Sequence, residues 1–413
     1  MSARYSAPEI FKVIKDFDLA PEKIDAIENA PLDSPALVVA GAGSGKTELL
    51  AVRVLWLVAN GYARPEQILG LTFTRKAATE LSKRIFEALL KLRETSYWPE
   101  NVDYEFVAPT ISTYNAFSNQ IFRDNCLALG YESESTLLSE AAAFQLAREV
   151  CVRYGSEVSG SLSDLDLNLD TLVQKVLELS QALSDNGQSA DAVRNVIEAT
   201  ANHIGSLPKK AGAEIDSRFV YIEEIVEGLK PTPLIAELAE KFQQEKKRRS
   251  MVDYSDQVAL AYKAVSENAQ AAQLIRENFT AILLDEYQDT SVLQTKLLST
   301  LFGNKSVFAV GDPNQSIYGW RGASSSNLDQ FGQDFGSVRH FSLQTSWRNP
   351  IKVLDMANRI ALPLQEPASY EKVSSRVEHV LPVKLVAKPD AIEGDTDFAF
   401  EQTIEDEAEV VAG

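Results

Sequence analysis

The stretch Ala40-Gly41-Ala42-Gly43-Ser44-Gly45-Lys46-Thr47 decides the fold that the sequence predicts. It has the spacing of a P-loop, with alanine in place of the usual first glycine. Small residues let successive backbone N–H groups curl around phosphates, and the helix that follows points its N-terminus at the negative charge. Lys46 is then placed to reach the β- and γ-phosphates, and the Thr47 hydroxyl to ligate Mg²⁺. The stretch therefore predicts a binding site for a nucleoside triphosphate with Mg²⁺.

Short apolar runs surround the P-loop and end in polar or glycine-rich turns, as buried parallel strands do. Helical patterns over 47–58 and 76–89 follow the first two runs. The alternation of strand, turn and helix predicts an α/β fold with a parallel sheet covered by helices. The expected strands are Ala36–Ala40, Gln67–Thr72, Thr110–Thr113, Ala281–Leu284, Ser306–Val310 and His340–Leu343.

A pair of acidic residues, Asp285-Glu286, directly follows one of these runs. A carboxylate at the carboxyl end of a strand lies on the ligand side of an open α/β sheet. Asp285 is therefore suited to hold Mg²⁺, directly or through water, and Glu286 to polarise the attacking water. The long separation of Lys46 from Asp285 requires a large insertion between neighbouring strands.

Residues 119–245 supply that insertion, because the strand pattern stops there and amphipathic helical patterns replace it. A polar stretch over 155–170 predicts a loop between two of the helices. The chain returns through a basic run, Lys246-Lys247-Arg248-Arg249. Such a run is either a solvated helix face or a nucleic-acid contact, and the sequence leaves both interpretations open.

The overall charge is strongly acidic. Forty Lys and Arg against fifty-nine Asp and Glu give a net charge of −19 over 413 residues. This balance argues against coating nucleic acid through bulk positive charge, but it allows a narrow local groove. The length predicts more than one domain, and the acidic segment after residue 384 is either a tail or the first part of another domain.

The remaining features predict a cytoplasmic protein without a membrane segment. The N-terminus is too polar for a signal peptide, and no apolar run approaches the length of a membrane span. Cys126 and Cys151 fit no metal spacing and form no disulfide framework, which is typical of a reducing compartment.

Two longer stretches resemble motifs II and III of the UvrD/Rep/PcrA family of superfamily 1 DNA helicases. They are Asp285-Glu286-Tyr287-Gln288-Asp289-Thr290 and Val310-Gly311-Asp312-Pro313-Asn314-Gln315-Ser316-Ile317-Tyr318-Gly319-Trp320-Arg321-Gly322-Ala323. Leu71–Ala78 is similar to motif Ia of that family, and Gln344–Arg348 to its motif IV. Together the motifs extend, in the order of the family, from about residue 19 to residue 350.

The resemblance implies a RecA-like domain 1A that is interrupted by a helical domain 1B and followed by the start of a second RecA-like domain, 2A. We expect residues 1–118 and 246–340 to form domain 1A and residues 119–245 to form domain 1B. Residues 341–413 would then be the incomplete start of domain 2A with the acidic C-terminal segment.

The family also implies ATP-driven 3′-to-5′ movement on single-stranded DNA, with ATP and Mg²⁺ as cofactors. Gln315 matches the motif III glutamine that senses the γ-phosphate, and Gln288 matches the glutamine that links the nucleotide site to motif III. Arg348 matches an arginine that reaches the γ-phosphate and stabilises charge in the transition state. Trp347 matches an aromatic residue that stacks on adenine.

Aromatic residues of the matched motifs line the DNA path in the family. Stacking suits that task, because every base has a π-face and each stacked base contributes roughly 1–3 kcal/mol without reading sequence. For Phe73 taken alone, core packing is the competing interpretation. The residues expected to contact DNA are Phe73, Arg75, Asn115, Tyr318, Trp320 and Arg321.

Two positions depart from the family pattern. Lys23 stands where the family has a glutamine that recognises adenine, and lysine offers donors only, so it cannot make a two-way hydrogen bond to the adenine edge. Adenine selectivity is then either lost or moved to other residues. Asn115 and Ala116 stand where many members have His-Ser; Asn115 can still bond phosphate, and Ala116 cannot.

From this we expect the ATP-binding and hydrolysing portion of a 3′-5′ DNA helicase or translocase that acts on single-stranded DNA and its junctions with duplex DNA, in repair or recombination. Motifs V and VI of the family are expected beyond Gly413, so the chain would be a fragment, a truncated product or part of a split protein. Its partners would be the missing domains or another subunit. Two alternatives are a subunit of a helicase–nuclease complex resembling RecB or AdnAB, and a truncated nucleotide-binding module without helicase output.

Overall fold

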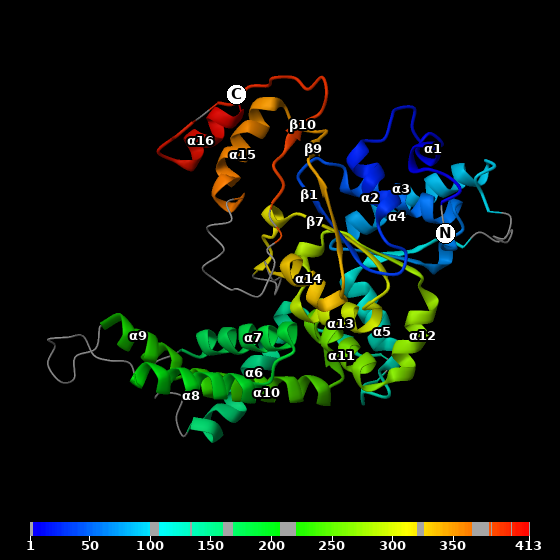
Figure 1. The fold of residues 1–413 in the computed structure, drawn as a ribbon. Helices are drawn as coiled ribbons and strands as arrows, with labels where there is room; N and C mark the ends of the chain where they lie inside the picture. The colour runs from blue at the N-terminus through cyan, green and yellow to red at the C-terminus, as the bar shows by residue number, and fades with distance from the viewer. Residues whose placement is uncertain are drawn as a thin grey trace.

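A six-stranded parallel sheet forms the centre of the protein, in the order β3-β2-β6-β7-β1-β8 (Figure 1). The computed structural model describes residues 3–99, 107–132, 134–159, 168–206, 220–319, 326–365, 380, 382–397 and 399–412. The six strands are β1 (Ala36–Ala40), β2 (Ile68–Thr72), β3 (Thr110–Thr113), β6 (Ala281–Leu284), β7 (Ser306–Gly311) and β8 (Arg339–Leu343). Each expected strand forms within one residue of its expected bounds, so the predicted α/β parallel sheet is confirmed.

Helices cover both faces of the sheet, which explains why its central strands are continuous apolar runs. Successive side chains alternate between two cores: Val38 and Leu283 face one, and Leu37 and Ile282 face the other. The first face carries α1 (Ala7–Phe11), α2 (Pro21–Asn29), α3 (Lys46–Ala59) and α4 (Arg75–Arg93). The second carries α5 (Tyr114–Asn125), α11 (Tyr254–Glu267), α12 (Ala269–Asn278), α13 (Val292–Phe302) and α14 (Asn327–Phe335).

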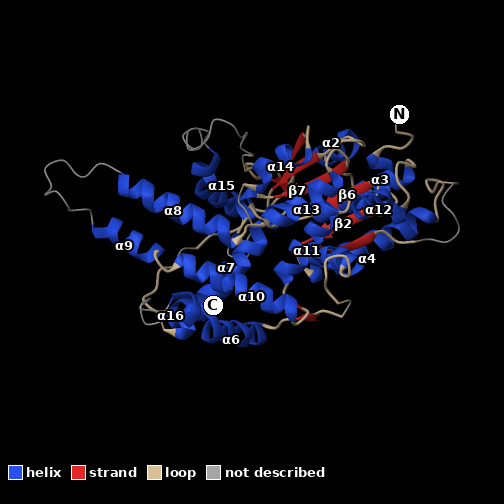
Figure 2. Ribbon diagram, turned by 90° about the horizontal axis from the view of Figure 1, so that it is seen from below, coloured by secondary structure: helices blue, strands red, loops and turns tan. Residues whose placement is uncertain are grey.

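The insertion is a helical arm that extends away from the sheet (Figure 1, Figure 2). Its helices are α6 (Glu140–Ser159), α7 (Leu169–Asn186), α8 (Ala190–Ser206), α9 (Val220–Leu229) and α10 (Thr232–Arg248). Helices α6, α7, α8 and α10 enclose a separate core that includes Val150, Val176, Ala236 and Phe242. The arm can therefore bury apolar surface of its own and does not depend only on the sheet for stability.

Three details differ from the sequence predictions. The segment 119–245 is not free of strands, because β4 (Thr136–Leu137) pairs with β5 (Met251–Val252) where the chain enters and leaves the arm. Two-residue strands leave no apolar run that a sequence pattern could reveal. The expected boundary at residue 340 falls inside β8, and α6 extends to Ser159, into the stretch expected to be a loop.

In the basic run at the base of the arm, Lys246, Arg248 and Arg249 pair with carboxylates of the protein. Lys246 is 1% exposed, and its ammonium lies 2.5 Å from Asp253 Oδ2 and 2.7 Å from Asp256 Oδ2. Arg248 and Arg249 both contact the Glu245 carboxylate. Neither interpretation of the run holds for Lys246, because its side chain is buried. The two carboxylates that pair with its charge lie beyond the end of α10, so the pattern of that helix does not reveal them.

The segment after β8 contains a two-stranded sheet that is separate from the central one. Strand β9 (Thr345–Ser346) pairs in parallel with β10 (Val386–Ala387), and α15 (Ile351–Gln365) packs beside them through the Asn358 amide, which bonds both backbone groups of Leu385. A final helix, α16 (Ile404–Ala412), lies within the acidic segment. None of the helices in the described ranges is long and apolar enough to cross a membrane.

Replacing Lys246 by methionine should destabilise the protein by about 3–5 kcal/mol, because the buried Asp256 would be left beside the half-buried Asp253 without the cation that pairs with both. Urea unfolding measures this change. Lys247→Met is the matched control, since Lys247 is the exposed neighbour in the same run. Equal effects of the two substitutions would contradict a structural role for the Lys246 pairs.

Candidate nucleotide and nucleic-acid site

The candidate site lies along one edge of the sheet, where all six parallel strands have their carboxyl ends. Segments that are far apart in the sequence meet there, as at the ligand edge of other open α/β sheets. The P-loop follows β1, Phe73 follows β2, Asn115 follows β3 and Asp285 follows β6. Asp312 follows β7, and the stretch 344–348 follows β8.

The P-loop backbone needs glycine at two positions. Gly43 and Gly45 have φ angles of +78° and +87°, which L side chains rarely adopt. A Cβ atom at Gly43 would also lie 2.6 Å from Ser346 Oγ. Gly45 is the N-cap of α3, so Lys46 and Thr47 begin the helix whose N-terminus faces the loop.

Two serines at the P-loop have buried hydroxyl groups that find no hydrogen-bond partner in the described part of the chain. They are Ser44, within the loop, and Ser346, which lies over Gly43. Buried hydroxyl groups are normally hydrogen-bonded, so two unpartnered ones beside a glycine loop fit a site that receives a polar ligand such as a triphosphate. Ala40 is buried at the end of β1, and Ala42 is half-buried in the loop.

A chain of polar contacts runs from the P-loop lysine to the segment after β7. Lys46 Nζ lies 3.2 Å from Glu286 Oε2, and Gln288 Nε2 donates to the same oxygen at 2.8 Å. Gln288 Oε1 accepts from the backbone N–H of Asp312 at 3.0 Å, and Gln315 Nε2 donates to Asp312 Oδ2 at 2.6 Å. The structure thus brings four of the five expected catalytic residues into one connected network.

The carboxylates of this network are crowded and poorly solvated. Asp285 is 5% exposed, and burial together with the charge of Glu286 raises its pKa to about 7. Burial and Glu286 also raise the pKa of Asp289 to about 6. One oxygen of each of these two aspartates is buried without a hydrogen-bond partner among the described residues.

Unpartnered carboxylate oxygens in an acidic cluster fit a cation. Within the described part of the chain, no group of three or more His, Cys, Asp and Glu side chains could hold a metal alone. Mg²⁺ at nucleotide sites usually takes one or two carboxylates and completes its shell with phosphate and water. Asp285 and the half-buried Thr47 hydroxyl are suitable ligands for such an ion.

The segment after β8 is held on the P-loop by backbone hydrogen bonds. The N–H of Trp347 donates to Gly43 O at 2.9 Å, and the N–H of Gly41 donates to Leu343 O at 3.3 Å. Trp347 is 39% exposed, and Arg348 beside it is also exposed. Both side chains therefore adjoin the glycine loop while remaining accessible to a ligand.

Lys23 occupies an unexpected position. It is 2% exposed and pairs with Glu48, the ammonium lying 2.6 Å from Glu48 Oε2. Its Nζ atom is 5.9 Å from the centre of the Trp347 ring and 2.5 Å from the place a Cβ atom of Gly45 would take. Lys23 thus lies between the glycine loop and Trp347, with a carboxylate beside it.

Sequence reasoning missed several of these groups. Glu22 accepts from the backbone N–H groups of Gln344 and Thr345 and so fixes the segment that carries Trp347. Glu48, Asp289 and Ser346 were also missed as site residues. Asp289 and Ser346 lie within the quoted motif stretches, which was a usable signal, whereas Glu22 and Glu48 had no signal beyond their closeness to Lys23 and Lys46.

The residues expected to contact DNA are partly brought together. The rings of Phe73 and Tyr318 pack against each other in a tilted arrangement, with their centres 4.7 Å apart and their planes at 32°. Phe73 is half-buried at the sheet edge and outside both cores, which argues against core packing. Arg75 and Asn115 are exposed at the starts of α4 and α5. Trp320 and Arg321 lie outside the described residues.

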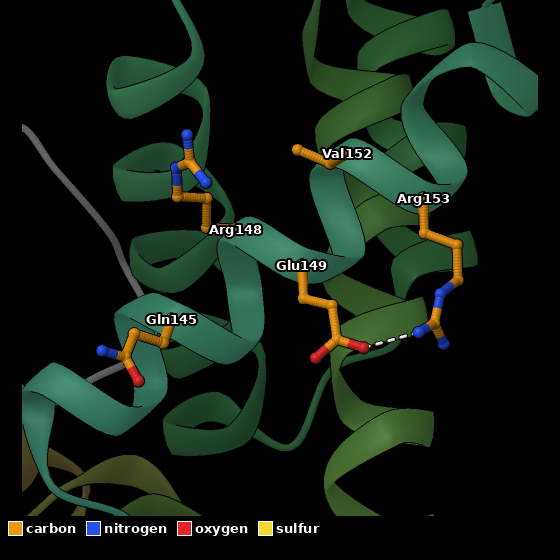
Figure 3. Close-up of a pocket in the computed structure, with 5 residues that line it drawn as sticks. All are labelled: Gln145, Arg148, Glu149, Val152 and Arg153. Atoms are coloured by element: carbon orange, nitrogen blue, oxygen red, sulfur yellow. Dashed lines mark hydrogen bonds and ion pairs between the residues drawn. The ribbon is translucent and has the colours of Figure 1, made fainter.

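A shallow hollow on the arm is separate from this edge. It has a volume of about 470 Å³ and lies on α6, lined by Gln145, Arg148, Glu149, Val152 and Arg153 (Figure 3). Glu149 pairs with Arg153 and also with Arg249, so much of the charge there is neutralised internally. The hollow has neither the glycine loop nor the carboxylates of the sheet edge.

The fold and the site together define a P-loop nucleotide-binding domain with a helical insertion. The chain belongs to the UvrD/REP helicase family, because residues 19–336 match the N-terminal domain of that family. This confirms the resemblance and the RecA-like fold that the motifs predicted.

Individual relatives agree with this assignment. The chain is 28% identical over 329 residues to the ATP-dependent DNA helicase PcrA of Leuconostoc citreum, covering 79% of this chain and 37% of the relative. It is 27% identical over 355 residues to the ATP-dependent DNA helicase Rep of Escherichia coli K12, covering 86% and 44%. It is 26% identical over 329 residues to DNA helicase II of the same organism, covering 79% and 38%. The chain thus spans about two fifths of the length of these relatives.

Replacing Asp285 by asparagine should stabilise the metal-free protein at alkaline pH. The folded protein holds a proton on Asp285 up to pH about 7, whereas the unfolded chain releases it near 3.8, so stability falls as pH rises between these values. The amide has no proton to lose in this range, so the substitution removes that loss. The gain at pH 8 is at most about 4 kcal/mol at 1.36 kcal/mol per pKa unit.

Urea unfolding with a chelator at pH 8 and pH 5 measures the effect, which should shrink at the lower pH. The exposed Asp16→Asn serves as control. A variant that is less stable than the wild type at pH 8 would contradict the burial of an uncompensated charge.

Proposed function

We propose that the chain binds and hydrolyses ATP as part of a 3′-5′ DNA helicase or translocase that acts on single-stranded DNA and its junctions, in repair or recombination. The observation that carries this proposal is the contact chain from Lys46 through Glu286, Gln288 and Asp312 to Gln315. Gln315 is three residues before Tyr318, whose ring packs against Phe73. Groups suited to phosphate chemistry and groups suited to base stacking are thus joined within one network.

The proposed chemistry follows from the positions of these groups. The P-loop N–H groups, the N-terminus of α3 and Lys46 would hold the phosphates, and Thr47 and Asp285 would hold Mg²⁺. Bound Mg²⁺ would neutralise charge that develops on the phosphates. When the phosphates attract Lys46, Glu286 loses its cationic partner and becomes a stronger acceptor for a proton of the attacking water. Arg348 and Gln315 then contact the γ-phosphate.

The base of the nucleotide has two neighbours in this proposal. Trp347 offers an exposed ring for stacking, and the Lys23–Glu48 pair offers a donor and an acceptor side by side. Adenine presents an acceptor at N7 and a donor at N6, which matches the pair, whereas guanine presents acceptors at both N7 and O6. The selectivity that Lys23 alone cannot provide would then come from Lys23 and Glu48 together.

Glu286→Gln tests the hydrolytic role. The amide keeps the hydrogen-bond geometry but is a very weak base, so we expect turnover stimulated by single-stranded DNA to fall about 100-fold or more while Mg·ATP binding persists. Glu87→Gln, on the exposed face of α4, is the control. A variant that retains most of the wild-type turnover would refute Glu286 as the base.

Glu48→Gln tests the selectivity for adenine. Glutamine can donate to guanine O6, so the preference for ATP over GTP should fall about tenfold, in line with about 1.5 kcal/mol for one hydrogen bond. Competition of ATP and GTP for a fluorescent nucleotide measures the ratio. The proposal fails if ATP and GTP affinities change by the same factor.

A further inference from the structure

The turn between β3 and α5 is hydrogen-bonded at two points to the part of the chain that runs from the end of β6 to the start of α13. The buried Tyr114 hydroxyl donates to the backbone carbonyl of Asp285 at 2.9 Å. The Gln294 amide, near the start of α13, donates through Nε2 to Asn115 Oδ1 at 2.8 Å. Tyr114 is therefore tied to the stretch that carries the candidate catalytic carboxylates, and Asn115 to the helix that follows that stretch.

The chemistry of its neighbours fixes the orientation of the Gln294 amide. The backbone N–H of Ser291 can only donate, and it lies 2.9 Å from Gln294 Oε1. The Ser291 hydroxyl in turn accepts from the N–H of Gln294, which completes a capping box at the start of α13. Since Oε1 is used in this way, Nε2 faces Asn115, and only Oδ1 of Asn115 can accept from it.

The orientation of the Gln294 amide also fixes the orientation of the Asn115 amide. With Oδ1 held by Gln294, the two N–H donors of Nδ2 are the groups left for a ligand. Asn115 is exposed in the first turn of α5, where the helix N-terminus also favours negative charge. It lies on the same sheet edge as Phe73, because Thr72 and Thr113 are paired neighbours in β2 and β3.

We propose that Gln294 is a positioning residue that holds Asn115 with its amide donors directed at the phosphates or base acceptors of a bound single strand. The proposal rests on the proposed function, which puts Asn115 on the path of the strand, and it deepens that function by naming the group that sets the polarity of this contact. A plain helix cap at Ser291 is the competing role for Gln294.

Gln294→Glu separates the two roles. Glutamate still accepts from the N–H of Ser291, so the capping box and the stability are retained. Its carboxylate repels Asn115 Oδ1, so the Asn115 amide turns, donates inward and directs its oxygen at the strand. We expect the affinity for a fluorescent oligothymidylate to fall about 3- to 10-fold, with unchanged thermal stability.

The same substitution in an Asn115→Ala background is the decisive control. If Gln294 acts through Asn115, Gln294→Glu should have no further effect there, because the side chain that it orients is gone. Equal losses of affinity in both backgrounds would overturn the proposal, since they would reflect the added charge alone. Asn115→Asp should also weaken binding, because it keeps the inward acceptor and replaces the outward donors by a carboxylate.

A measurement without DNA tests the orientation itself. In the wild-type protein, hydrogen exchange of side-chain amides followed by NMR should be slow at Gln294 Nε2 and fast at Asn115 Nδ2, and Gln294→Glu should slow exchange at Asn115. Fast exchange at Gln294 would overturn the proposal whatever the protein binds. A wild-type chain that shows this pattern but does not bind the oligonucleotide would instead refute the proposed function and leave the orientation established.

Discussion

The contact between Lys46 and Glu286 is the interaction on which the rest of the site depends. It joins the loop after β1 to the loop after β6. Among the described residues, the Lys46 ammonium is the cation that acts on a cluster of three acidic side chains, Asp285, Glu286 and Asp289. Burial is the main cause of the raised pKa values of Asp285 and Asp289, and the charge of Glu286 adds to it, while the single ammonium of Lys46 offsets them only in part. The site is built for additional positive charge, which a metal bound with a triphosphate would supply.

The sequence predicted the sheet well because its strands are buried on both faces. A strand with two buried faces is a continuous apolar run, and such runs are visible in one sequence without any knowledge of pairing. The P-loop and the Asp285-Glu286 pair were equally visible, because each follows such a run directly. The edge at which they meet is then a consequence of parallel topology, so most of the candidate site could be predicted before the structure was known.

What the sequence could not predict depends on contacts between distant side chains. Lys246 in a basic run has the pattern of a solvated helix face, and only the position of β5 and α11 brings Asp253 and Asp256 to it. Lys23 was visible as a departure, but its partner Glu48 lies on another helix. The polarity of Asn115 is set by Gln294, which is 179 positions away. Each case needs tertiary packing, which local propensity does not contain.

The acidic balance of the chain is compatible with a strand-binding edge once the nature of the contacts is considered. The rings of Phe73 and Tyr318 and the donors of Asn115 carry no net charge, so the strand contacts proposed for them would not need a bulk positive potential. Some basic side chains contribute less to long-range attraction, because Lys46 and Lys246 pair with carboxylates of the protein and Arg248 and Arg249 share the Glu245 carboxylate. A site of this kind would hold a strand through local contacts more than through long-range electrostatic attraction. The orientation of each neutral donor then matters more than in a basic groove, where a misdirected amide would be masked by neighbouring cations.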